Sequence, residues 1–300
     1  MVNAMKGRVL LLLVSSLGFP LVRAGVVEDV VGALNHADFP KAEAYIHSYR
    51  ASHGVTPEAL EAMSWMARAA LDLKKYDQAE KYADETYQLS KSELAKRRLD
   101  QEPHLPLALG AAIEVEANVM AARGVRVQAL AYLREQRQKY YATSIRARIQ
   151  KNINLLTLEG KPAPLLERVT LPKGKPALIF FWAHWCGDCH AEVPVLAQLK
   201  AEFESKGLAM LGPTQMYGYV AGGKDASPAA EASYIEQVRQ RYYANIFPGP
   251  APVNSANFLR YGASTVPTLV LVDRGGIVRL YHPGAMTYAE LRPQVEKLFR

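Results

Sequence analysis

Residues 175–194 read KPALIFFWAHWCGDCHAEVP and decide the fold of the C-terminal half of the chain. Within this stretch, residues 177–182 form a continuous apolar run, which predicts a buried strand. Apolar side chains at helical spacing follow and predict a helix over about 186–206. Cys186 and Cys189, the only two cysteines of the chain, therefore lie where a strand ends and a helix begins.

The position of this cysteine pair favours dithiol–disulfide chemistry. A helix N-terminus presents unpaired N–H groups and a positive dipole end to Cys186, which lowers the pKa of the thiol and makes it a nucleophile. Cys189, one helical turn later, can attack a mixed disulfide at Cys186 and release the product. Two alternatives are weaker. A zinc site needs about four ligands, and a structural disulfide that closes so short a loop adds little stability.

Two motifs of this region resemble thioredoxin-fold proteins. Residues 175–194 resemble the active-site segment of the extracytoplasmic TlpA/ResA-like thiol–disulfide oxidoreductases, and Thr265-Val266-Pro267-Thr268 precedes a second apolar strand. The resemblance implies that Pro267 is a cis-proline lying against the active-site disulfide. It also implies that backbone groups beside it, at Val266, pair with an extended peptide substrate. Residues 158–300 are thus expected to form an α/β thioredoxin-like fold.

The remaining segments of this region fit that expectation. Residues 208–211 would complete a right-handed β-α-β unit, and residues 229–244 have the pattern of a second helix. Leu269–Asp273 and Ile277–Tyr281 flank a glycine-containing turn, which predicts a hairpin. A helix at about 287–299 ends the chain.

Side chains around the cysteines are candidates for substrate contact and for tuning the redox potential. Trp185 and Pro267 should shape a shallow apolar contact surface. Asp188, between the cysteines, raises the pKa of the thiolate by like-charge repulsion, which favours a reductant. His184 and His190 would act in the opposite direction if they were protonated.

A proton acceptor for Cys189 is not evident from the sequence. Phe180 stands where thioredoxin itself has a buried acid. Residues 213–260 form a segment longer than thioredoxin needs, which either borders the active site and sets specificity or is a solvated loop. Three acids of this segment are candidates for the missing role: Asp225, Glu231 and Glu236.

Residues 25–157 predict a separate helical domain. Segments 65–82 and 116–133 share an Ala-rich helix, a short turn, and a Gln-Ala pair that opens a second helix. They resemble tetratricopeptide-type helical hairpins, although their spacing of 50 residues departs from the usual period of about 34. An ordinary helical bundle is the alternative. A Gly/Pro-rich linker at 158–164 marks the domain boundary.

Residues 1–24 have the outline of a secretory signal peptide. Lys6 and Arg8 precede the apolar run at 9–14, and Ala24 offers a small residue for cleavage. An uncleaved membrane anchor is the alternative. This pattern predicts a periplasmic or otherwise secreted protein, soluble after signal cleavage, in a compartment that permits disulfides.

The sequence therefore predicts an extracytoplasmic thiol–disulfide oxidoreductase, more a reductase than an oxidant, that serves cell redox homeostasis. The chain carries a net charge of +7, but its densest basic run, Lys96-Arg97-Arg98, is too short to predict nucleic-acid binding. No cofactor or metal is implied. Expected partners are a protein disulfide or dithiol substrate, an upstream thiol partner in the membrane, and a protein bound by the helical domain. The alternative is a non-catalytic interaction protein in which the helical domain is the working part.

Overall fold

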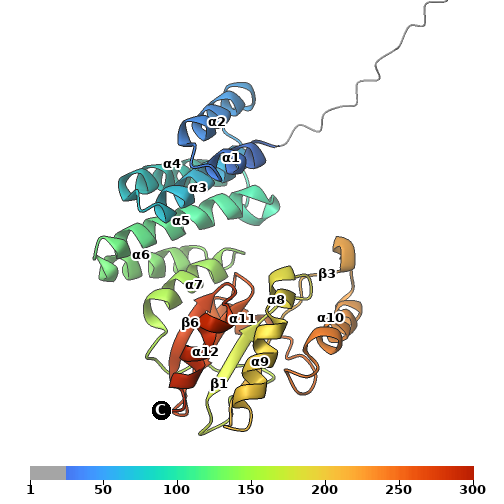
Figure 1. The fold of residues 1–300 in the computed structure, drawn as a ribbon. Coiled ribbons are helices and arrows are strands. Elements are labelled where there is room, and N and C mark those ends of the chain that lie inside the picture. The colour runs from blue at the N-terminus through green and yellow to red at the C-terminus, as the bar shows by residue number, and fades with distance from the viewer. Residues whose placement is uncertain (1–24) are drawn as a thin grey trace, which may run out of the picture.

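The computed structural model describes residues 25–300, so the predicted signal peptide at residues 1–24 lies outside the described residues. A helical N-terminal region extends to Thr157, and an α/β C-terminal region follows (Figure 1). The last N-terminal helix, α7 (Arg146–Thr157), lies between the two and packs against both.

The N-terminal region is a stack of helix pairs, as the sequence predicts. Helices α1, α3 and α5 pack on one another in order, and each also packs against the helix that follows it in the chain. The tetratricopeptide-like character of this stack stays a prediction. The elements are α1 (Val26–Leu34), α2 (Phe39–His53), α3 (Pro57–Asp72), α4 (Tyr76–Leu94), the 3-10 turn η1 (Leu99–Gln101), α5 (His104–Ala122), α6 (Arg126–Lys139) and α7.

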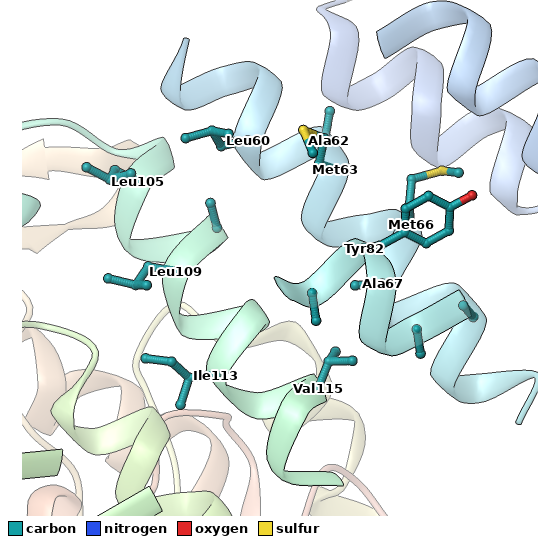
Figure 2. Packing of buried hydrophobic residues seen from close by; sticks show 14 of the residues in the cluster. Leu60, Ala62, Met63, Met66, Ala67, Tyr82, Leu105, Leu109, Ile113 and Val115 are labelled. Carbon is teal, nitrogen blue, oxygen red and sulfur yellow. The ribbon is translucent and has the colours of Figure 1, made fainter. Parts of the chain in front are cut away.

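The core of this region lies between α3, α4 and α5 (Figure 2). Alanines on α3 and α5 let these helices approach closely, while Leu60, Met66 and Leu109 fill the space between them. Helix α5 is long and apolar enough to cross a membrane, but over half of it is buried in this core. Its apolar character is therefore explained by packing within the protein.

The C-terminal region contains a four-stranded sheet in the order β2-β1-β5-β6. Strands β1 and β2 are parallel, and β5 runs antiparallel to both β1 and β6. The strands predicted for this region are all present, and so are the helices predicted over 229–244 and 287–299. The elements are β1 (Ala177–Phe181), α8 (Gly187–Ala191), α9 (Val193–Phe203), β2 (Ala209–Leu211), β3 (Tyr219–Val220), η2 (Ala221–Gly223), β4 (Lys224–Asp225), α10 (Pro228–Tyr243), α11 (Ser255–Tyr261), β5 (Thr268–Val272), β6 (Val278–Pro283) and α12 (Tyr288–Lys297).

Strand β1 is buried on both faces, which explains its continuous apolar sequence. Because side chains alternate along a strand, Leu178 and Phe180 enter a core with α9, α10 and α12. Ile179 and Phe181 face the opposite core, where the Phe258 ring of α11 meets Phe181 edge-on at 5.2 Å. Helices thus cover both faces of the sheet.

The single helix predicted over 186–206 is two helices. Helices α8 and α9 meet at Glu192, the only residue between them. Pro194 lies in the first turn of α9, where its missing N–H group costs no intrahelical hydrogen bond. The proline therefore begins a new helix beside the cysteines.

The predicted linker is bound to the sheet. The Gly160 N–H group donates to the Val278 carbonyl at 2.8 Å, and the Val278 N–H group donates to the Lys161 carbonyl at 2.9 Å. The Ala163 N–H group adds a bond to the Gly276 carbonyl at 2.9 Å. Residues 160–163 thus lie along β6, on the outer edge of the sheet.

Helix α7 contacts the C-terminal region through a close backbone approach. Gly262 ends α11 with a φ of +60°, and a Cβ atom placed on it would lie 2.6 Å from the Lys151 Cα atom. Only glycine fits this position without a shift of one helix. In addition, the Asn154 side chain donates to the Arg260 carbonyl at 3.3 Å. The two regions are therefore packed directly against each other.

Candidate active site

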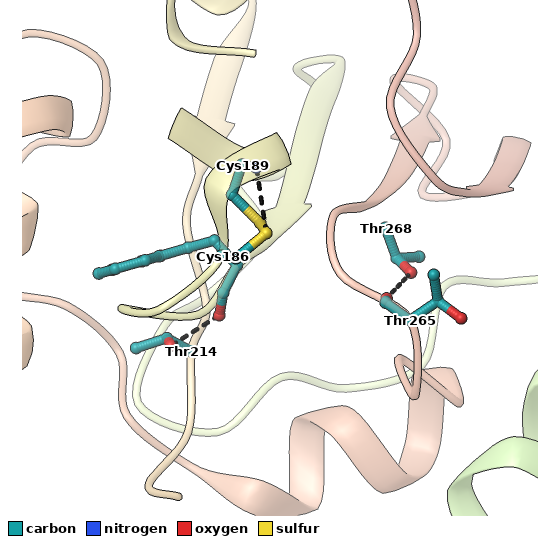
Figure 3. Close-up of a disulfide and its surroundings, with 6 residues drawn as sticks. Cys186, Cys189, Thr214, Thr265 and Thr268 are labelled. Atoms are coloured by element: carbon teal, nitrogen blue, oxygen red, sulfur yellow. Dashed lines mark hydrogen bonds between the residues drawn. A yellow bond between two sulfur atoms is a disulfide. The ribbon is translucent and has the colours of Figure 1, made fainter. Parts of the chain in front are cut away.

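The two cysteines form a disulfide at the junction of β1 and α8 (Figure 3). Cys186 is the N-cap residue of α8, and its sulfur accepts a hydrogen bond from the Cys189 N–H group at 3.0 Å. Cys186 keeps 3% of its surface exposed, whereas Cys189 keeps none. Of the two cysteines, Cys186 is thus the one that reaches the surface.

Hydrogen bonds fix the loop that carries the cysteines. The Trp182 indole N–H donates to the Gly212 carbonyl at 2.8 Å, and the Thr214 hydroxyl donates to the Trp182 carbonyl at 2.7 Å. These contacts tie the end of β1 to the loop after β2. The backbone that leads from β1 to the disulfide is therefore anchored to the neighbouring strand's loop.

The loop before β5 faces the disulfide, and its Val266–Pro267 peptide bond is cis, as the resemblance implied. The Thr268 hydroxyl donates to the Thr265 carbonyl at 2.6 Å, which closes the loop (Figure 3). Within residues 25–300, the N–H and C=O groups of Val266 make no hydrogen bond. Backbone groups of this kind are available to an extended peptide.

A groove of about 470 Å³ lies next to the disulfide, lined by Trp185 and by the loop before β5 but by neither cysteine, and we call it the active-site groove. Trp185, which is 48% exposed, and Val266 line it from the C-terminal region. Ser144 and Ala147, at the start of α7, line it from the helical region. The predicted contact residues Trp185 and Val266 thus line one groove, whereas Pro267 is buried and does not line it.

The segment between β2 and β5 borders this site rather than projecting into solvent. The Tyr217 ring packs edge-on against the Trp185 ring at 5.3 Å. Glu231 of α10 holds the segment in place, since its carboxylate accepts the N–H groups of Tyr217 and Gly218, the latter at 2.8 Å. The same carboxylate lies 3.1 Å from the His184 Nε2 atom.

His184 and His190, both predicted to tune the site, have different environments. His184 is buried against Glu231 and is surrounded by tyrosine rings. His190 stacks on Tyr242 at 4.1 Å, and burial, with a smaller effect from Arg241, lowers its pKa. A lowered pKa keeps the His190 ring neutral at neutral pH, so its predicted effect as a cation has no support there.

Asp188 is exposed, and its predicted effect on the thiolate stays a prediction. The three acids that the sequence offered as proton acceptors are all engaged elsewhere or exposed. Asp225 is exposed, Glu236 pairs with Arg239 at 2.7 Å, and Glu231 binds the groups described above.

Sequence reasoning missed Glu192, which is 3% exposed and follows Cys189 by one helical turn. Burial raises the pKa of this carboxyl, and Asp188 adds to the effect, although a hydrogen bond from the Met286 N–H group opposes it. Its spacing of three residues from Cys189 places both on one helix face. The sequence spacing could have suggested Glu192 as a neighbour of Cys189. Burial of its carboxyl is evident only from the structure, where the loop at Met286 packs over it.

The part of the chain that the structure describes shows no cluster of side chains suited to coordinate a metal ion. Residues 25–300 contain no group of three or more His, Cys, Asp or Glu side chains that could hold an ion.

Comparison with known proteins places this site in a family context. Residues 167–299 match the model of a family described as a thioredoxin-like domain. The thiol-disulfide oxidoreductase ResA of Bacillus anthracis is 25% identical over 164 residues, which cover 54% of this chain and 84% of that protein. The thiol:disulfide interchange protein DsbE of Escherichia coli K12 is 29% identical over 157 residues, covering 50% of this chain and 76% of that protein.

Among solved structures, a putative DsbE from Chlorobium tepidum is similar at 21% identity and a TM-score of 0.37. The match covers 47% of this chain and 98% of that one. From the family match, the sheet order and the cysteine pair, the C-terminal part of this chain is a thioredoxin-like domain, related to the thiol-disulfide oxidoreductases ResA and DsbE.

Proposed function

We propose that this protein is a thiol–disulfide oxidoreductase that reduces disulfides of protein substrates outside the cytoplasm. The observation that carries the proposal is the Cys186–Cys189 disulfide at the strand–helix junction, opposite the Val266–Pro267 loop. The oxidoreductase activity is supported by the names of the relatives ResA and DsbE. The reductive direction and the location rest on sequence features.

The reaction begins with both cysteines reduced. The Cys186 thiolate attacks one sulfur of a substrate disulfide, so a Cys186–substrate bond forms and the substrate S–S bond breaks. The electron pair of that bond leaves on the second substrate sulfur, which takes up a proton. Cys186 takes this role because its sulfur lies at the N-cap of α8, accepts the Cys189 N–H group and is the less buried of the two.

Resolution of the mixed disulfide needs Cys189 as a thiolate. Cys189 is fully buried, so its proton requires an acceptor within the protein. Glu192 suits this role, because burial raises the pKa of its carboxyl toward the operating pH of a general base. Cys189 then attacks the Cys186 sulfur, and the substrate leaves as a thiol. The protein now carries the Cys186–Cys189 disulfide and has been oxidised by two electrons. An external thiol donor must restore the dithiol.

Substrate binding is assigned to the active-site groove. An extended segment would pair with the free N–H and C=O groups of Val266, while the exposed Trp185 ring supplies apolar contact. Backbone pairing of this kind binds many sequences, since it uses no side chain of the substrate. This fits a protein rather than a small molecule as substrate.

Two cysteine variants test the mechanism. Cys186→Ser should abolish disulfide exchange, whereas Cys189→Ser should accumulate mixed disulfides that thiol reductants release. Trapping in cells with the Cys189→Ser protein would also identify the substrate and the proposed membrane-bound thiol donor. Exchange by Cys186→Ser at the wild-type rate would refute the mechanism and favour a non-catalytic role based on the helical region.

The direction is tested by an equilibrium redox titration of the Cys186–Cys189 couple. A midpoint near or below about −220 mV, in the range of glutaredoxins and thioredoxin, is expected for a reductant. A midpoint near about −120 mV, as in a strong oxidant, would reverse the proposed direction. The location is tested by cleavage after residue 24 and by recovery of the protein in the periplasmic fraction.

A further inference from the structure

A second cavity continues the active-site groove into the interface between the helical and thioredoxin-like regions. This cavity has a volume of about 530 Å³. Ser144, Ser264 and Thr265 line both it and the active-site groove, so the two cavities adjoin each other. A chain that leaves the disulfide past Val266 can therefore run between the loop before β5 and the start of α7.

The walls of this second cavity carry an excess of positive charge, and we call it the cationic pocket. Arg68 of α3 and both Arg148 and Lys151 of α7 line it, with Glu114 of α5 as the only acidic lining residue. The Glu114 carboxylate binds the Arg148 Nε atom at 3.1 Å and the Lys151 Nζ atom at 2.8 Å. Although burial opposes ionisation, these two cations hold the pKa of Glu114 at about 2. Three cations thus face one carboxylate.

Of the three cations, Arg68 is the one that forms no ion pair with Glu114. Its guanidinium lies 4.4 Å from the centre of the Trp65 ring. Its Nε atom is buried, and no hydrogen-bond acceptor for it exists within the described residues. Burial, and then the charge of Arg148, lower the pKa of Arg68 to about 10, which still leaves it charged at neutral pH. Arg68 thus lines the pocket as a charged group with no carboxylate in direct contact, which favours an anionic ligand there.

We propose that the cationic pocket binds an acidic side chain of the substrate polypeptide, a few residues from the cysteine that reacts at Cys186. This inference rests on the proposed function and specifies its substrate class. A carboxylate suits the pocket because guanidinium and ammonium groups bind carboxylates through charge-assisted hydrogen bonds. Backbone pairing at Val266 does not discriminate among sequences, whereas a fixed charge in the second cavity does.

The inference also assigns a role to the helical region. Arg68 and Glu114 belong to helices well before the thioredoxin-like fold, and Arg148 and Lys151 belong to α7 at its border. These helices form a wall of the substrate path itself. The helical region thereby selects substrates at the reacting site, in addition to any partner that it binds elsewhere.

The test uses the reduced full-length protein and peptides of about eight residues, which span about 25 Å when extended. Each peptide carries one cysteine as a mixed disulfide with 5-thio-2-nitrobenzoate. The Cys186 thiolate attacks the peptide sulfur, and the coloured thionitrobenzoate leaves with the electron pair of the broken bond. Cys189 then releases the reduced peptide. A single Glu is moved along the peptide from one position to the next, and a peptide with Gln at the same position is the reference.

At the position that reaches the pocket, the Glu peptide should react about tenfold faster than its Gln partner below saturation. In single-turnover measurements the gain should appear as a lower half-saturating peptide concentration with little change in the maximal rate, and it should shrink as salt is added. Equal rates for Glu and Gln at every position, or a preference for Lys, would overturn the inference.

Variants of Arg68 show whether the preference for Glu arises in this pocket. Arg68 suits the test because its replacement breaks no ion pair with a carboxylate of the protein. Arg68→Met should reduce the Glu-to-Gln ratio toward one, and Arg68→Lys should retain most of it. Arg134→Gln, on the exposed face of α6, removes the same charge outside the groove and should leave the ratio unchanged. A ratio that survives in Arg68→Met or falls equally in Arg134→Gln would contradict the assignment to this pocket.

The same assay separates failure of this inference from failure of the proposed function. If neither peptide reacts faster with the wild-type protein than with Cys186→Ser, the oxidoreductase function itself is wrong. If both peptides react at equal rates that depend on Cys186, the function stands and only the acidic-substrate inference falls.

Discussion

Removal of the Glu231 carboxylate should destabilise the protein strongly, although Glu231 contacts neither cysteine. Its carboxylate accepts hydrogen bonds from Tyr217 and Gly218 and lies 3.1 Å from His184 Nε2, in a site where both side chains are 1% exposed. Glu231→Ala leaves two backbone N–H groups and one imidazole without this partner. Breaking a buried interaction of this kind by removing one partner costs about 3–5 kcal/mol.

The measurement is the free energy of unfolding from urea titrations, with the midpoint and the slope compared between variants. A loss of about 3–5 kcal/mol is a large part of the total for a protein whose stability is about 5–15 kcal/mol. Glu231→Gln is the matched control. It keeps one acceptor oxygen and should lose less, about 1–3 kcal/mol.

The same variants should disturb the active site. Glu231 holds the backbone at Tyr217, and the Tyr217 ring packs on Trp185 in the active-site groove. Peptide disulfides should therefore react with a higher KM in Glu231→Gln. A free energy of unfolding for Glu231→Ala within about 1 kcal/mol of wild type, below the cost expected for such a buried group, would refute this reasoning.

Three further changes test other parts of the structure. Glu192→Gln should slow release of the mixed disulfide by at least about tenfold, since it removes the proposed acceptor for Cys189; stopped-flow kinetics with an unchanged rate would exclude that role. Burial, with Glu80 and Asp84, raises the pKa of Glu116 to about 7. Because this pKa is raised on folding, wild type should lose stability relative to Glu116→Gln as pH rises from about 4.5 through about 7. Thermal unfolding at several pH values measures this, and a difference in Tm that stays constant would contradict it. Gly262→Ala should cost about 1–3 kcal/mol because its Cβ atom would meet Lys151; an unchanged Tm and unchanged proteolysis between α7 and α11 would argue against that contact.

The thioredoxin-like fold was predictable because its signals are local. The apolar run of β1, the cysteine spacing and the sequence before β5 each belong to one short segment, and the structure places all three as expected. The helix pairs at 65–82 and 116–133 were predictable for the same reason, since the apolar face of a helix and the turn that follows it are both determined by neighbouring residues.

The acids of the site were not predictable, because burial of a carboxyl depends on distant segments. Glu192 is covered where the loop at Met286 reaches α8, and Glu231 is covered where the segment after β2 folds back on His184. The position of the linker was also missed. A Gly/Pro-rich sequence correctly predicts that a helix ends, but it does not reveal that Gly160 bonds to β6.

That pairing bears on how the chain avoids self-association. The exposed edge of a sheet offers unpaired N–H and C=O groups as a template for another copy of the protein. Here β6 would be such an edge, but residues 160–163 cover its start through hydrogen bonds at Gly276 and Val278. The opposite edge, β2, has only three residues. A fragment that begins after residue 164 would keep the cysteines and the whole sheet yet lose this cover, and it should form oligomers that the full chain does not.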